Sequence, residues 1–209
     1  MLGPGSGRNG HRGPQRLAIV KKMAKRKKPN RRLFEFSQKD AVRRIQRLPP
    51  QEVEHDRLHI SRELLDRTLD GLRERSGGWR ESGAIWTGNL KDSDSSVRDV
   101  LLFHDLCDDK GRSLSLELSE EAKFALYREL AKRGQKLVGM IHTHPEDWVD
   151  LSGIDKANQL CSRIGFWSLV LPYYGERGWE IESTGVHIRV DSGWHWFSKE
   201  ESLKRIIVK

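Results

Sequence analysis

The sequence predicts a mixed α/β (α+β) fold, in which helices flank one central β-sheet. Apolar runs of strand length recur between residues 83 and 190. Stretches with apolar residues at helical spacing, opened by a serine, alternate with them. The chain has 209 residues, of which 36% are hydrophobic, so it is long enough to bury a substantial core.

Charge divides the chain into two predicted parts. Residues 1–55 hold 15 lysines and arginines against 4 aspartates and glutamates, whereas residues 56–209 hold 23 against 26. We expect residues 1–55 to form a basic, largely disordered arm with a short amphipathic helix over residues 33–48, and residues 56–209 to form the folded domain. The arm is either a solvated tail or a binder of an anionic partner. Nucleic acid is only weakly indicated, because no base-stacking aromatics interleave the basic residues.

Composition and cysteine usage also indicate the cellular compartment. No apolar run reaches about 18 residues, so no membrane span is expected. The N-terminal stretch lacks the apolar segment of a secretory signal. Cys107 and Cys161 form no C-x-x-C pair, and a disulfide framework is not expected. We therefore predict a cytoplasmic protein.

The first half of the predicted domain alternates strands with one long helix. Ser61 is a good N-cap, and the leucines that follow it repeat at helical spacing until Ser76-Gly77-Gly78. Polar loops and an Asp-Gly-rich turn separate the apolar runs that come next. The predicted elements are a strand at 58–60, a helix at 61–75, and strands at 83–90, 97–106 and 114–118.

In the second half, serines again open the predicted helices. Ser119 is followed by acidic residues, which favour a helix N-terminus, and Gly134 ends that helix. An apolar central strand spans residues 137–141. The later predicted elements are a helix at 152–164, a strand at 166–171, a hairpin pairing 179–183 with 186–190 around Thr184-Gly185, and a short charged helix in the tail.

A candidate metal site follows the central strand. His142-Thr143-His144-Pro145 is separated by six residues from Ser152-Gly153-Ile154-Asp155. Side chains alternate along a strand, so His142 and His144 point the same way, and Ser152 and Asp155 share a face of the first helical turn. Three protein ligands with one open position are typical of catalytic zinc. A histidine pair alone usually has a structural role, and Ser152 alone would be only an N-cap; the combined spacing favours metal binding.

A hydrolytic zinc site also needs a general base. Glu146 and Asp147 follow the histidines, but nothing in the sequence fixes their direction. Glu81 is the better candidate, because it opens the apolar strand at 83–90. This requires that strand to lie beside the one carrying the histidines. Other residues could contact substrate or simply pack, namely Trp79, Arg80, Trp148 and Val149; the remaining histidines are expected to be structural.

This pattern resembles the JAMM motif of the JAB/MPN metalloprotease family. The resemblance implies a JAB/MPN-like (cytidine deaminase-like) fold with Zn²⁺ bound by His142, His144 and Asp155. It further implies that Glu81 is the general base and then the acid for the leaving amine. Ser152 would stabilise the oxyanion. Many family members cleave after the C-terminal glycine of ubiquitin or a ubiquitin-like protein.

The resemblance extends over about residues 57–190 and implies a biological setting. A compact domain with a separate arm is similar to prokaryotic members, which accompany homologues of ubiquitin-activating and ubiquitin-conjugating enzymes, some of them in antiphage defence. We therefore expect an isopeptidase or peptidase that processes or deconjugates a ubiquitin-like protein. The alternatives are a peptidase that trims a sulfur-carrier precursor or a small peptide, and a non-enzymatic MPN-like or nucleic-acid-associated binding module.

Overall fold

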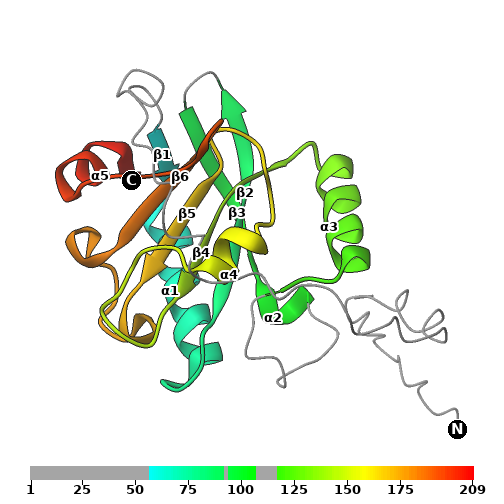
Figure 1. Cartoon of the computed structure of the whole chain (residues 1–209). Helices are drawn as coiled ribbons and strands as arrows, with labels where there is room; N and C mark the ends of the chain where they lie inside the picture. The colour runs from blue at the N-terminus through cyan, green and yellow to red at the C-terminus, as the bar shows by residue number, and fades with distance from the viewer. Residues whose placement is uncertain (1–56, 92–93, 107–116) are drawn as a thin grey trace, which may run out of the picture. The chain divides into compact units, whose positions relative to one another are not determined.

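The described part of the chain is built around one mixed β-sheet flanked by helices. The computed structural model describes residues 57–91, 94–106 and 117–209. Within them, eight strands form a sheet in the order β7-β6-β5-β4-β2-β3-β1-β8 (Figure 1). The predicted mixed α/β fold is confirmed. The strands are β1 (Arg57–Ile60), β2 (Gly83–Lys91), β3 (Asp94–Leu102), β4 (Lys136–Thr143), β5 (Trp167–Leu171), β6 (Gly185–Val190), β7 (Gly193–Trp196) and β8 (Ile206–Val208).

Five α-helices and two 3₁₀ helices accompany the sheet in the described residues. The α-helices are α1 (Arg62–Ser76), α2 (Phe103–Leu106), α3 (Glu120–Lys132), α4 (Gly153–Ala157) and α5 (Lys199–Arg205). The 3₁₀ helices are η4 (Tyr173–Gly175) and η5 (Ile181–Ser183). The predicted arm with its helix at 33–48, and most of the predicted strand at 114–118, lie outside the described residues.

β4 lies in the interior of the sheet and packs on both faces. It pairs with β5 in parallel and with β2 in antiparallel orientation. Val138 and Ile141 belong to the core cluster that α1 covers, whereas Leu137 belongs to the cluster that α3 covers. Side chains alternate between the faces of a strand, so His142, one residue after Ile141, lies on the α3 side.

The predicted N-caps of the two long helices are confirmed. The hydroxyl of Ser61 accepts a hydrogen bond from the Leu64 amide at the start of α1, and that of Ser119 accepts one from the Ala122 amide at the start of α3. α1 ends at Ser76, and the C-cap residue Gly77 has φ of 55°, a conformation that suits glycine.

Three predicted elements are wrong in extent or pairing. The helix expected at 152–164 ends at Ala157. The strand expected at 97–106 ends at Leu102 as part of β3, and the short helix α2 follows from Phe103. The hairpin expected around Thr184-Gly185 is also wrong. β6 instead pairs with β7, with Val190 opposite Gly193, while residues 181–183 form η5.

Among the described residues, no helix combines the length and the apolar character needed to cross a bilayer.

Candidate metal centre

The two histidines meet at the C-terminal end of β4. His142 is 0% exposed and His144 4%, and their Nε2 atoms lie 3.2 Å apart. His142 sits opposite Gly83 of β2 and Val170 of β5, so backbone pairing on both sides fixes its place. The structure thus brings both imidazoles to one point, as the alternation of side chains predicts.

Asp155 completes a group that can hold a metal ion. Its carboxylate oxygens lie 3.5 Å from Nε2 of His142 and 3.5 Å from Nε2 of His144. Two nitrogen ligands at about 2.0–2.1 Å from a tetrahedral zinc ion are themselves roughly 3.3–3.4 Å apart, so the donors already have suitable separations. Two imidazole nitrogens and one carboxylate oxygen thus face one another, and this set of donor atoms could bind a divalent cation.

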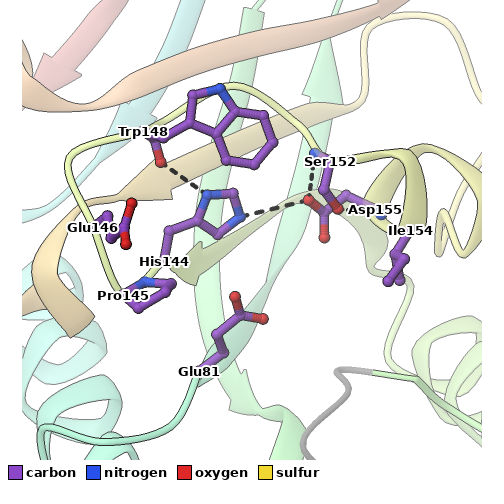
Figure 2. Close-up of a pocket in the computed structure, with 8 residues that line it drawn as sticks. All are labelled: Glu81, His144, Pro145, Glu146, Trp148, Ser152, Ile154 and Asp155. Atoms are coloured by element: carbon purple, nitrogen blue, oxygen red, sulfur yellow. Dashed lines mark hydrogen bonds and ion pairs between the residues drawn. The ribbon is translucent and has the colours of Figure 1, made fainter. Parts of the chain in front are cut away.

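A capping box orients Asp155. The hydroxyl oxygen of Ser152 accepts a hydrogen bond from the Asp155 amide at 3.0 Å, and the Asp155 carboxylate accepts one from the Ser152 amide at 2.7 Å. This reciprocal pair opens α4. Figure 2 shows the Asp155 carboxylate facing the His144 ring. Ser152 also lines the pocket, so its hydroxyl group lies at the edge of the site.

The carbonyl of Trp148 fixes the orientation of the His144 ring. Nδ1 of His144 lies 2.9 Å from the Trp148 carbonyl oxygen, which can only accept, so Nδ1 carries the proton (Figure 2). The lone pair on Nε2 is then free for a metal, the arrangement that outer-shell partners of metal-binding histidines produce. The indole of Trp148 also stacks on His144, with ring centroids 5.1 Å apart.

Glu81 lies beside this group because β2 runs along β4. Thr143 donates its amide to the Ser82 carbonyl at 3.0 Å, and Ser82 donates its amide to the Thr143 hydroxyl oxygen at 3.0 Å. The adjacency of strands that the Glu81 assignment requires is therefore present. Figure 2 shows the Glu81 carboxylate directed toward His144 and Asp155.

The pKa values of the two carboxyl groups, Glu81 and Asp155, are shifted in opposite directions. Burial raises the pKa of Glu81, and this outweighs the lowering by the two nearby imidazoles. Burial also acts to raise the pKa of Asp155, but hydrogen bonds from His142, His144 and Ser152 bring that pKa well below its ordinary range. Asp155 therefore favours its charged form, as a ligand must, while the pKa of Glu81 is shifted in the opposite direction.

These groups line an open pocket of about 310 Å³. Its wall is formed by Glu81, His144, Pro145, Glu146, Trp148, Ser152, Ile154 and Asp155 (Figure 2). Trp148 and Ile154 are exposed although they are large and apolar, and they flank the carboxylate and hydroxyl groups. The pocket thus combines convergent polar groups with an apolar rim, as ligand sites commonly do.

Several residues considered from sequence lie elsewhere. Trp79 is exposed, and Arg80 donates Nε–H to the Arg75 carbonyl at 2.6 Å; neither lines the pocket. Trp86, whose direction the sequence alone does not give, is buried and donates its indole N–H to Thr68, so it belongs to the core. Val149 also does not line the pocket.

Sequence reasoning missed two contacts that hold the segments next to the site. The Tyr174 amide donates to the His144 carbonyl at 2.8 Å, from a turn in which two successive tyrosines have positive φ. Asp150 contacts His187 of β6, a histidine expected to be only structural. Neither contact has a local sequence signal, since both join segments far apart in the chain.

Comparison with known proteins adds information on fold. No family model matches the sequence, and no curated protein matches it. Protein DSY2949 from Desulfitobacterium hafniense matches with a TM-score of 0.51 at 16% identity, over 73% of this chain and 92% of that one. At this identity, the likeness shows a shared fold alone.

Two further solved structures match at lower scores. AF2198, a JAB1/MPN domain protein from Archaeoglobus fulgidus, has a TM-score of 0.40 at 14% identity, covering 73% of this chain and 96% of that one. A protein from Salinibacter ruber has a TM-score of 0.47 at 16% identity, covering 72% and 91%. Function must therefore be argued from the site.

Proposed function

We propose that this protein is a zinc-dependent peptidase of the JAMM type. The observation that supports the proposal most strongly is the convergence of His142, His144 and Asp155 at metal-binding separations, with Glu81 beside them in one open pocket. A structural zinc site would be closed by a fourth protein ligand, whereas this group leaves room for a reacting molecule.

Within this proposal, Glu81 carries protons. A bound zinc ion would supply Lewis acidity and lower the pKa of a nearby water to about 7. Glu81 takes a proton from the attacking water and later delivers it to the leaving amine. In the metal-free chain burial raises the pKa of Glu81, and a higher pKa makes its carboxylate a stronger base.

Ser152 stabilises the developing negative charge. Its oxygen is held by the Asp155 amide, so the hydroxyl group is fixed in place before substrate binds. Its O–H donates to the scissile carbonyl oxygen as that atom gains charge, the function of an oxyanion donor. The same residue therefore caps α4 and takes part in the chemistry.

We propose that the substrate is a ubiquitin-like protein, cleaved after its C-terminal glycine during precursor processing or deconjugation. The exposed apolar rim of Trp148 and Ile154 offers a surface for an extended peptide beside the metal group. The JAMM-like spacing supports the bond type. By the same resemblance, activating- and conjugating-enzyme homologues of a bacterial, cytoplasmic, antiphage-linked system are the proposed partners.

Two matched substrates test this proposal. Ubiquitin-like proteins ending in Gly-Gly are joined either to a short peptide extension or to a lysine side-chain amine, and incubated with the zinc-loaded full chain. Cleavage after Gly-Gly that is lost in Glu81→Gln supports the proposal, and the preferred substrate separates processing from deconjugation. Cleavage of only short unstructured peptides would favour a small-peptide or sulfur-carrier role. Absence of any cleavage would favour a binding module.

A further inference from the structure

The two halves of the metal group are joined by a connecting loop, residues 144–152. Its first half is held by β5 and η4. The His144 amide donates to the Leu171 carbonyl at 2.8 Å, and the Tyr173 amide donates to the Glu146 carbonyl at 3.2 Å. These contacts fix the histidine end of the loop, but they do not reach Ser152 or Asp155.

The second half of the connecting loop lies directly on β6. A Cβ atom on Gly185 would be 1.9 Å from the carbonyl oxygen of Val149 and 2.9 Å from its carbonyl carbon. Any side chain at this position would therefore force the loop off the strand. The glycine is needed for this close approach of two backbones.

The next loop residue is tied to the same strand. Nε2 of His187 lies 3.2 Å from Oδ1 of Asp150, and His187 is 1% exposed. Its other ring nitrogen, Nδ1, lies 3.3 Å from the Ser168 carbonyl, and its ring stacks on Trp196. Contacts with β5 and β7 thus fix the His187 ring, and this ring in turn contacts Asp150 of the connecting loop.

Asp150 connects this anchor with α4. Its Oδ1 also accepts a hydrogen bond from the Leu151 amide at 2.7 Å, and its Oδ2 lies 3.6 Å from Nζ of Lys156, a residue of α4. α4 itself has five residues and buries none of them. The helix has no packed face of its own, so its place depends on the loop that leads into it.

We propose that β6 positions Ser152 and Asp155 for metal binding and chemistry, through the close approach at Gly185 and the contact between His187 and Asp150. Gly185, His187 and Asp150 are positioning residues, since none lines the pocket. This inference rests on the proposed function insofar as Asp155 is a metal ligand, but the contact of the connecting loop with β6 can be measured without metal.

Hydrogen exchange tests the anchoring. In His187→Leu, which removes the ring nitrogens, peptides covering residues 145–155 should exchange severalfold faster, while peptides from β4 keep wild-type rates. His187→Gln retains an N–H donor and should restore much of the protection. His195→Leu is the matched control, because His195 lies on the neighbouring strand against Phe197 and away from the loop.

Cobalt binding tests the consequence for the site. Competition against a chelator gives the Co²⁺ affinity, and the visible spectrum reports ligand geometry. We expect His187→Leu to weaken Co²⁺ binding by about tenfold, comparable to the loss of an outer-shell partner, with an altered spectrum. Asp150→Ala removes the same contact from the loop side, outside the core, and keeps the test valid if His187→Leu does not fold.

Two glycines provide an independent comparison. Gly185→Ala should displace the connecting loop and weaken Co²⁺ binding. Gly88→Ala is its control, because a Cβ there would be 2.0 Å from the Ser96 carbonyl, an equally severe clash between β2 and β3. Both variants should lose thermal stability, but only Gly185→Ala should change the spectrum.

The outcomes separate this inference from the proposed function. If the exchange rates of the connecting loop and the Co²⁺ affinity stay at wild-type values in both His187→Leu and Asp150→Ala, the positioning role is overturned. An equal loss in His195→Leu would show a general effect on stability and overturn it as well. A wild-type chain that binds no Co²⁺ would refute the metal centre, while the exchange data would still decide whether β6 holds the loop.

Discussion

The two sides of the candidate metal centre are held in very different ways. The histidine side belongs to β4, which is hydrogen-bonded to β2 and β5, and His142 is fully buried. The carboxylate side belongs to α4, which has no buried residue and is held by a capping box and the connecting loop. A central strand opens only when much of the fold opens, whereas a short exposed helix opens locally. The histidines are thus a fixed pair, and Asp155 is the ligand whose position depends on local contacts.

Ligand removal should have the largest effect and should distinguish the two sides. His142→Ala and Asp155→Ala should each abolish zinc binding and cleavage, because two remaining ligands hold zinc poorly. Asp155→Ala should also fray α4, since it removes half of the capping box, at a cost of about 1 kcal/mol. Metal analysis and hydrogen exchange of the chelator-treated chain measure the two effects. Equal fraying of α4 in His142→Ala would contradict the comparison.

Glu81→Gln should separate metal binding from chemistry. The change keeps the side-chain shape but removes the proton carrier, so cleavage should fall by about 10²–10⁴-fold. Zinc affinity should stay near the wild-type value, because Glu81 is outside the ligand group. Parallel zinc titration and cleavage assays provide the measurement. Full activity in this variant would refute the assignment of the base.

Ser152→Ala should remove two functions at once. Loss of the N-cap should cost about 1 kcal/mol. Loss of the hydroxyl donor should slow cleavage by about 10²–10³-fold. Ser119→Ala, which removes the matching cap of α3, is the control for the first effect. If the two variants slow cleavage equally, the role of Ser152 is confined to capping.

Trp148→Ala should have the smallest effect on the metal. The carbonyl that accepts from His144 belongs to the backbone and survives the substitution. Loss of the ring stack should cost about 0.5–1.5 kcal/mol. Zinc affinity should change only a few-fold, while KM should rise, because the indole lines the pocket. A large loss of zinc with unchanged KM would show that the ring itself holds His144 in place.

Short-range patterns made the fixed side of the site predictable. Alternation along a strand is sufficient to bring His142 and His144 together, and the caps at Ser61 and Ser119 depend only on residues three positions away. The neighbouring position of β2 was inferred from the chemistry that Glu81 would perform, and the register of β2 with β4 agrees with it.

Long-range contacts explain what the sequence did not reveal. The N-cap at Ser152 predicts a helix to residue 164, but α4 ends at Ala157, and the Leu160 carbonyl accepts a hydrogen bond from the Tyr127 hydroxyl of α3 at 3.0 Å. The segment after Ala157 is therefore held to α3 by a contact between distant parts of the chain, which the residues near Ser152 do not reveal. The sequence predicts Gly185 in a turn, but it lies in β6, where the absence of a side chain lets the backbone of Val149 come close.

Zinc titration of the chelator-stripped full chain tests the central claim most directly, because every other role depends on the ligand group. The account predicts one zinc ion per wild-type chain and none in a variant that replaces His142, His144 and Asp155 together by alanine. Absence of zinc binding by the wild-type chain, or equal binding by both proteins, would contradict it.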